Sequence, residues 1–372
     1  MEGREPSRLP AIDLVRGIVM VLMTLDHSSS SFNAKRTLAD GAAMFAPDTV
    51  LEPLQFITRW VTHLCAPTFV MLAGLSLAIS VARRRRAGVH GSVIDRDILI
   101  RGALLIVIDA AWMGWIWRLG LPILQLGVLY AIGMAMIGMI ALRRLPPAVV
   151  GAIGLAILVL GEVVLSRIDP STTLAAATLV GGQVGSIYWL YPFLPWAGFL
   201  LVGWALGSRI AEGAAPGGLG MRARDWWALA ALAALVFVVV RGLNAYGNEG
   251  LFRRDGGWDA AWIEWLHVSK YPPSLSYAAL ELGIAFALLG ALWHVRPRPL
   301  GPLMVFGQTA LFFYLFHVHI LKGVAVALGI YKTEGLGTVY VGWVALLVLL
   351  YPACRWYLGV KRRHPDSVLR FV

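Results

Sequence analysis

The feature that most constrains the fold is a series of ten long apolar segments along the chain. Each segment is long enough to cross a hydrocarbon core of about 30 Å as an α-helix. The segments cover residues 11–27, 56–81, 98–117, 123–142, 147–165, 188–208, 226–242, 274–293, 302–321 and 338–358. A backbone in lipid must satisfy its own hydrogen bonds, so these segments predict membrane-spanning helices. The expected fold class is therefore all-α, a polytopic transmembrane bundle of about ten helices.

The composition agrees with this fold class. Hydrophobic residues make up 58% of the 372 residues and charged residues 14%, which is more apolar and less charged than a soluble domain. A net charge of +11 would suit a nucleic-acid partner, but the basic residues lie mostly in short clusters between the apolar segments. We therefore expect the lipid bilayer as a partner and no nucleic acid, with the protein a multi-pass component of the inner (cytoplasmic) cell membrane.

The basic clusters also predict the orientation. They follow the second, fourth, sixth, eighth and tenth segments, at 83–86, 143–144, 209 to 224, 296–298 and 361–363. All of them fall on one side if the first segment starts in the cytoplasm, so both termini are expected to be cytoplasmic. No repeat or low-complexity tract divides the chain, and residues 1–372 are expected to form a single integral-membrane domain.

The first apolar segment carries ionisable residues at both ends. Asp13, Arg16 and His27 follow the spacing of one helix face, and Asp26 precedes His27. Charge within a bilayer costs free energy, so it indicates function. Arg16 and His27 would lie about 17 Å apart at roughly 1.5 Å per residue. Because Asp13 and Arg16 interrupt the apolar run and no small-residue cleavage site follows, we expect a retained helix, not a signal peptide.

Several histidines share the predicted outer layer with His27. His63 lies in the second segment, four residues after Arg59, and His317 and His319 lie near the outer end of the ninth. A single histidine of this kind is more often a hydrogen-bonded structural residue, but three helices that contribute to one layer favour a shared site. His317 and His319 are about 200° apart on a helix, so at most one of them faces a common cavity.

Motifs for other chemistries are missing. The sequence has no His-x-x-x-His pair, and its two cysteines lie inside apolar segments, so no metal ion is expected. It also lacks a phosphate-binding loop, a dinucleotide-binding glycine motif and a Gly-x-Ser-x-Gly elbow. Nucleotide hydrolysis, hydride transfer and serine hydrolase chemistry are therefore not supported.

Motifs along nearly the whole chain resemble one family. Residues 12–17 (IDLVRG) and 25–27 (LDH) are similar to the first-helix signature of membrane acyltransferases related to heparan-α-glucosaminide N-acetyltransferase. The spacing of Arg16 and His27 is also similar to the Arg-x10-His signature of the acyltransferase-3 group. Further stretches that resemble bacterial members of the first family lie at 62–74, 191–198, 269–275 and 305–317.

The resemblance implies an enzyme that takes an acetyl or other acyl group from cytoplasmic acetyl-CoA and delivers it to a sugar or glycan on the outer side. His27 would act as general base or acyl carrier beside Asp26, and His63 is the second candidate, because residues 28–55 lack the histidine that the animal enzymes place there. Asp26, about 100° from His27 on a helix, is a poor direct partner for its ring.

Binding residues are expected from their predicted positions along the helices. The expected substrate-binding residues are Arg59, Lys270, His317 and Gln125, and those for the phosphates of coenzyme A are Arg16, Arg101, Arg83 and Arg84. The alternative for Arg83 and Arg84 is topology alone. The alternative for Arg16 is an i,i+3 ion pair with Asp13.

Two other classes of function fit the sequence. A transporter of a small solute would use intramembrane charges such as Arg16, Asp109 and Glu281, and a non-catalytic membrane assembly factor would need none of the histidines. For an acyltransferase, N- or O-acylation, direct transfer or a covalent acyl-histidine, and a homo-oligomer all stay open.

Overall fold

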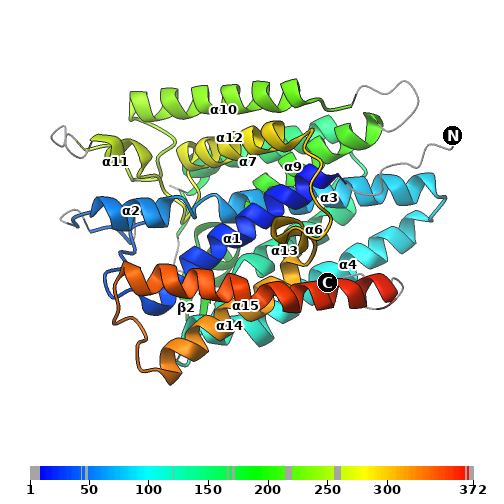
Figure 1. Cartoon of the computed structure of the whole chain (residues 1–372). Coiled ribbons are helices and arrows are strands. Elements are labelled where there is room, and N and C mark those ends of the chain that lie inside the picture. The colour runs from blue at the N-terminus through cyan, green and yellow to red at the C-terminus, as the bar shows by residue number, and fades with distance from the viewer. Residues whose placement is uncertain are drawn as a thin grey trace. The chain divides into compact units, whose positions relative to one another are not determined.

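The computed structural model of the chain is built mainly from helices (Figure 1). It describes residues 9–42, 44–46, 49–119, 121–165, 167–169, 172–213, 220–254, 261–364 and 367. Within these residues, eight helical segments are long and apolar enough to cross a membrane. The predicted all-α, polytopic helix bundle is therefore confirmed.

The eight segments match eight of the ten predicted ones. Their bounds are Pro53–Arg86, Gly91–Trp117, Pro147–Leu165, Phe193–Gly213, Ala223–Leu243, Leu275–Leu292, Ala310–Ala327 and Leu336–Arg363. The last six of these are helices α7, α9, α10, α12, α14 and α15. The first consists of α2 (Pro53–Trp60) and α3 (Cys65–Arg86) with a turn between them, and the second of α4 (Gly91–Ile108), the π-helical η1 (Asp109–Met113) and α5 (Gly114–Trp117).

The other two predicted segments are also helical. Helix α1 (Pro10–Phe32) has 23 residues, but its three charged side chains and four serines make it less apolar than the eight. It begins with proline at its first position, where the missing N–H costs no hydrogen bond. Helix α6 (Val128–Leu142) is strongly apolar but has only 15 residues, which is short for a full crossing.

The predicted helix over 302–321 is broken. Helix α13 (Pro302–Gln308) ends at Thr309, whose backbone leaves the helical region with φ −117° and ψ 24°, and α14 (Ala310–Ala327) starts anew. The Thr309 hydroxyl donates to the Val305 carbonyl oxygen at 2.8 Å, a side-chain bond that competes with regular helix geometry. The polar pair Gln308 and Thr309 at the break is too short to end the apolar segment 302–321 in a hydropathy profile.

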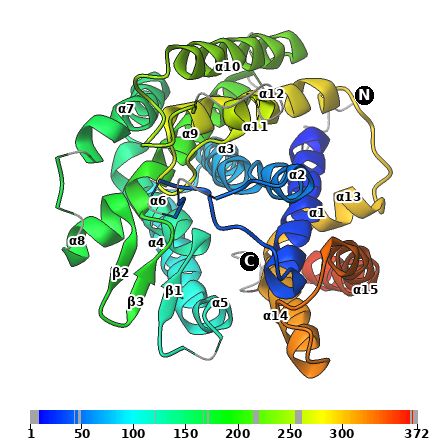
Figure 2. The same cartoon turned by 90° about the vertical axis from the view of Figure 1, so that its left-hand side faces the viewer.

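A small sheet replaces the start of two other predicted helices. Strand β3 (Ile187–Trp189) pairs in parallel with β1 (Leu124–Leu126) and antiparallel with β2 (Gly182–Val184). Positive φ angles at Gly181, Gly182 and Gly185 allow the tight path into and out of β2. The sheet is visible in Figure 2.

The chain forms two compact units from interleaved segments. The first unit contains Met1–Ala39, Ala46–Cys65 and Ala287–Val372, and the second contains Asp40–Phe45 and Ala66–Phe286. The single domain over residues 1–372 stays a prediction.

In the first unit, α1 packs against α13, α14 and α15 (Figure 2). Glycine brings the backbones into direct contact. A Cβ atom on Gly17 would lie 2.0 Å from the Leu303 carbonyl oxygen, and one on Gly307 would lie 1.9 Å from that of Asp13. Such small-residue contacts are how membrane helices pack closely. The register between α1 and the broken helix is therefore fixed.

In the second unit, glycine residues likewise bring the backbones of α9 and α3 into direct contact. A Cβ on Gly74 would lie 2.0 Å from the Leu200 carbonyl oxygen, and one on Gly203 would lie 2.0 Å from that of Met71.

The π-helical η1 carries a buried carboxylate, Asp109. Its Oδ2 accepts hydrogen bonds from the backbone N–H groups of Gly127 (2.6 Å) and Tyr130 (2.9 Å) at the start of α6. Asp109 therefore caps a helix inside the bundle.

Candidate active site

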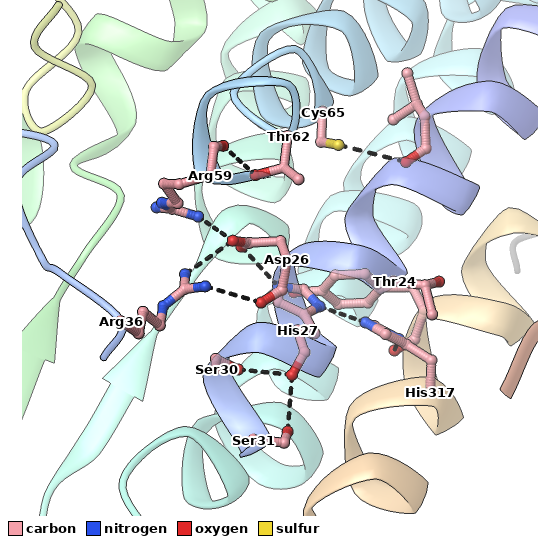
Figure 3. Close-up of polar contacts among 12 residues, drawn as sticks. Thr24, Asp26, His27, Ser30, Ser31, Arg36, Arg59, Thr62, Cys65 and His317 are labelled. Atoms are coloured by element: carbon pink, nitrogen blue, oxygen red, sulfur yellow. Dashed lines mark hydrogen bonds and ion pairs between the residues drawn. The ribbon is translucent and has the colours of Figure 1, made fainter. Parts of the chain in front are cut away.

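Asp26 and His27 lie in the last two turns of α1. The helix continues through Phe32, five residues beyond His27, so the expectation that His27 ends the first helix was wrong. The hydroxyls of Ser30 and Ser31 donate to the His27 carbonyl oxygen at 2.9 and 2.7 Å (Figure 3). The carbonyl oxygen of His27 therefore accepts side-chain hydrogen bonds from the last turn of α1.

The Asp26 carboxylate forms ion pairs with two arginines. Arg36, from the segment after α1, donates from Nη2 to Asp26 Oδ1 at 2.8 Å and from Nη1 to the Asp26 carbonyl oxygen at 3.0 Å. Arg59 of α2 donates to the same Oδ1 (Figure 3). All three side chains are only 13% exposed, so water screens these pairs weakly. The cluster fixes the Asp26 side chain and ties α1 to α2.

Arg36 was missed by the sequence prediction, which named only Arg59 in this region. One signal for Arg36 was available: it is a basic residue in the connection 28–55, which the predicted orientation assigns to the side where the positive-inside rule expects few arginines. An arginine on that side needs a partner or a function.

His27 contacts a second histidine from another helix of the first unit. Its Nδ1 lies 2.5 Å from Nε2 of His317 in α14, and the two rings stack with their centroids 4.8 Å apart. His317 is fully buried. Its other nitrogen, Nδ1, lies 2.7 Å from the Tyr314 carbonyl oxygen and 3.2 Å from that of Phe313. The structure thus brings together four predicted residues, namely Asp26, His27, Arg59 and His317.

These contacts assign the tautomers of the two rings. A carbonyl oxygen can only accept, so Nδ1 of His317 carries the proton that is donated to Tyr314. The neutral His317 ring then offers the lone pair of Nε2, and Nδ1 of His27 must donate to it. The neutral His27 ring therefore has its lone pair on Nε2.

Nε2 of His27 lies 3.7 Å from Oδ2 of Asp26. This distance is too long for a direct hydrogen bond, in agreement with the expectation that adjacent residues on a helix are poor direct partners. The carboxylate is close enough to stabilise a positive charge on the imidazole. The two atoms form a pair of hydrogen-bond acceptors side by side.

The other histidines of the predicted layer have different places. His63 is buried, at 2% exposure, but it lies in the turn between α2 and α3, not inside a continuous second helix as expected. His319 follows His317 by two residues in α14 and is half-buried. The contact with His27 is made by His317.

Arg16 forms the ion pair that was left open as an alternative. Its Nη1 donates to Asp13 Oδ1 at 3.0 Å and reaches the Gly307 carbonyl oxygen at 3.5 Å. Arg16 therefore contacts the last turn of α13, where a cation is favourable. It lies eleven residues before His27 on the same helix, about 17 Å away at roughly 1.5 Å per residue.

The remaining predicted residues belong to the second unit. Gln125 of β1 is buried and accepts a hydrogen bond from Nε of Arg118 at 3.1 Å. Lys270 is 3% exposed, and its Nζ lies 5.2 Å from the centre of the Tyr271 ring. Both residues are thus buried next to aromatic or polar neighbours in that unit.

The three predicted arginines of this unit differ in their surroundings. Arg84 donates to Oδ2 of Asp97 at 2.7 Å, so its charge is compensated. Arg83 and Arg101 are exposed. In the part of the chain that the structure describes, no group of three or more histidine, cysteine, aspartate or glutamate residues could hold a metal ion. That no metal is needed stays a prediction.

Comparison with known families agrees with the resemblance found in the motifs. The family described as heparan-alpha-glucosaminide N-acetyltransferase, catalytic, matches residues 8–229. The matched range includes Asp26, His27, Arg36 and Arg59, and His317 lies beyond it. No curated protein matches the chain. Because the match covers more than half of the 372 residues, the chain belongs to the heparan-alpha-glucosaminide N-acetyltransferase catalytic family, a family of membrane acetyltransferases.

Proposed function

We propose that the protein transfers an acetyl group from cytoplasmic acetyl-CoA to the amino group of a sugar on the outer side of the membrane, with Nε2 of His27 as general base. Family membership supports acetyl transfer in a membrane. The observation that carries the role of His27 is the chain of contacts from His27 through His317 to the Tyr314 carbonyl oxygen. It puts the basic lone pair of His27 on a defined nitrogen.

The reaction needs one proton to be moved. The lone pair of a neutral amine attacks the thioester carbonyl carbon, a C–N bond forms, and the C–S bond breaks. Nε2 of His27 takes one proton from the amine nitrogen, and the imidazolium returns it to the leaving thiolate. The products are the N-acetylated sugar and the free thiol of coenzyme A. Asp26, at 3.7 Å from Nε2, stabilises the transient imidazolium.

An amine is the proposed acceptor because the matching family is described as an N-acetyltransferase. The Asp26 carboxylate, whose Oδ2 lies 3.7 Å from Nε2 of His27, would also stabilise the positive charge that an attacking amine develops.

The donor is proposed to bind from the cytoplasmic side, with both termini on that side of the inner membrane. The basic clusters support this orientation. Arg83 and Arg101 are the candidates for the phosphates of coenzyme A because both are exposed. Arg16 and Arg84 are the other two candidates, and each also pairs with an aspartate.

A transporter is less well supported. Of the three charges that would couple transport, Asp109 caps α6 through two backbone N–H groups, and Arg16 pairs with Asp13. Both therefore have structural partners. Glu281 is the remaining one of the three.

The proposal is tested with purified protein in liposomes that contain glucosamine, with labelled acetyl-CoA added on the side of the basic clusters. Labelled N-acetylglucosamine should appear inside. Glucose, which differs at the reacting position by a hydroxyl in place of the amine, should be acetylated at least tenfold more slowly. Uptake of unmodified sugar without acetylation would support the transporter instead. Label that stays on the protein after an acid quench would indicate a covalent acyl-histidine in place of direct transfer.

A further inference from the structure

An arginine of the second unit, Arg118, lies at the end of a membrane-spanning segment and has no part in the proposed reaction. It directly follows α5 and is half-buried. The spanning segment Gly91–Trp117 begins shortly after the four arginines 83–86 at the end of α3, so Arg118 lies at the opposite end of the segment. In the predicted orientation this is the outer side, where the positive-inside rule expects few arginines. An arginine here therefore calls for a function.

The small sheet beside α5 holds the side chain of Arg118 (Figure 2). Gln125 of β1 and Tyr188 of β3 lie opposite each other in the parallel pair of strands. Nε of Arg118 donates to Oε1 of Gln125 at 3.1 Å, and the guanidinium carbon lies 4.2 Å from the centre of the Tyr188 ring. The hydrogen bond and the cation–π contact together fix the orientation of the guanidinium group. A ligand that binds it loses little side-chain entropy.

Most of the hydrogen-bonding capacity of Arg118 is left over. A guanidinium group has five N–H donors. Gln125 takes one, and the Tyr188 hydroxyl, which also interacts with Arg118, can take another. Among the described residues, no aspartate or glutamate forms an ion pair with Arg118. The site therefore offers a positive charge and several donors in one plane, which suits the oxygens of an anion.

The neighbours of Arg118 indicate where this anion comes from. Trp115, three residues earlier, is exposed, and so are Leu119 and Leu121 after it. In a chain that spans a membrane, exposed apolar side chains at the end of a spanning segment lie against lipid, and tryptophan is enriched at the level of the headgroups. The phosphates at that level belong to phospholipids.

We propose that Arg118, held by Gln125 and Tyr188, binds the phosphate of an anionic phospholipid whose acyl chains pack on Trp115 and Leu119. The planar guanidinium group can donate to two phosphate oxygens at once. A headgroup without a positive charge of its own binds best, because the ammonium group of a zwitterionic headgroup compensates the phosphate. Lipid binding at Arg118 is independent of acetyl transfer, so it can be measured without acetyl-CoA.

The experiment is a lipid titration of the purified full chain, followed by native mass spectrometry, with phosphatidylglycerol or phosphatidylcholine. The wild type should bind phosphatidylglycerol in preference to phosphatidylcholine. Other basic residues also attract anionic lipid, so the readout is the difference between variants in the affinity for the most tightly bound phosphatidylglycerol. Arg118→Gln should lower this affinity about tenfold or more, as for the loss of hydrogen bonds to a charged group.

Gln125→Glu is a second variant that keeps Arg118 and its tyrosine stack. It places a carboxylate beside the guanidinium group, which pairs with Arg118 and repels phosphate, so it should weaken phosphatidylglycerol binding as much as Arg118→Gln does. Arg167→Gln is the matched control. It removes an exposed arginine just after α7, in the same unit and on the same predicted side, and should leave the affinity unchanged. Thermal unfolding of each variant checks that it is folded, and Gln125→Glu still reports if Arg118→Gln does not fold.

An affinity for phosphatidylglycerol that neither Arg118→Gln nor Gln125→Glu lowers would overturn the proposal. The same loss in Arg167→Gln would do so too, because it would show attraction by overall charge and not by a site. Displacement of the lipid by excess inorganic phosphate would show a site for free phosphate. Equal affinity for phosphatidylcholine would show that the headgroup charge is not recognised. Either result would contradict an anionic phospholipid as the occupant.

Discussion

Nδ1 of His27 and Nε2 of His317 lie 2.5 Å apart, although 290 residues separate the two histidines in the sequence. The contact joins α1 to α14 within the first unit. Because His317 in turn donates to the Tyr314 carbonyl oxygen, the backbone of α14 decides which nitrogen of His27 is basic. The proposed base thus depends on a residue outside the range that the family match covers.

Replacement of His317 by alanine should reduce kcat about 10- to 100-fold, the range found for side chains that orient metal-binding histidines through a hydrogen bond. The side chain of His27 stays in place, but its tautomer is no longer fixed. His317→Gln should restore part of the rate, because its amide oxygen can accept from Nδ1 of His27. The measurement is acetyl transfer to glucosamine at saturating substrate.

His319→Ala is the matched control for His317, since it removes a histidine from the same helix two residues away. It should change kcat less than twofold. Equal losses in the two alanine variants, or no recovery in His317→Gln, would show that His317 acts on folding and not on the tautomer.

Replacement of Asp26 by alanine should lower the free energy of unfolding by about 3 kcal/mol, because it leaves two poorly exposed arginines without the carboxylate that both bind. Thermal unfolding in detergent measures the change. Lys35→Gln removes the neighbouring pair with Glu52, whose side chains are 72% and 56% exposed, and should cost less than about 1 kcal/mol. Similar costs for the two variants would contradict the importance assigned to the Asp26 cluster.

Replacement of Gly307 by alanine should destabilise the protein by about 1–3 kcal/mol through overpacking. Its Cβ would lie 1.9 Å from the Asp13 carbonyl oxygen, so α1 and α13 must move apart. Gly323→Ala in α14 meets nothing within 4 Å and should be neutral or stabilising, since alanine favours helix. A lower Tm for Gly323→Ala than for Gly307→Ala would contradict the packing of α1 on α13.

The stability of the second unit should fall as the pH rises from about 4.5 to about 7 through Glu249. Burial, with a contribution from the nearby Glu162 carboxylate, raises the pKa of Glu249 from 4.5 to about 7. In that window the folded state holds a proton that the unfolded state has released, so raising the pH favours unfolding. Tm measured from pH 4.5 to 8 should decline less in Glu249→Gln than in the wild type. Parallel curves for the two proteins would show that Glu249 does not contribute.

The sequence was sufficient for the class of fold and for part of the site. Ten apolar segments correspond to eight spanning helices together with α1 and α6. Of the histidines expected in one layer, His27 and His317 contact each other, and Arg59 pairs with Asp26 beside His27. His63 lies in the turn between α2 and α3 instead. The depth of a residue in the membrane can be predicted from the sequence, because the length of each apolar segment and the basic clusters beside it predict how the segment lies in the bilayer.

Other features depend on contacts that no local pattern reveals. Arg36 joins Asp26 through an irregular segment, and the tautomer of His27 depends on a carbonyl oxygen in a different helix. The break at Thr309 lies within a long apolar segment that only Gln308 and Thr309 interrupt at this point. Arg16 was assigned to coenzyme A, but its proximity to the Gly307 carbonyl follows from the glycine contacts between α1 and α13. These are consequences of tertiary packing.

The most direct test of the central claim is the single-turnover rate of acetyl transfer from labelled acetyl-CoA to glucosamine, compared in the wild type, His27→Ala and His63→Ala, with Tm as a check on folding. The account predicts a loss of at least 100-fold in His27→Ala, as expected when a general base is removed, and a much smaller loss in His63→Ala. An unchanged rate in a folded His27→Ala protein would contradict the account and remove His27 from the reaction.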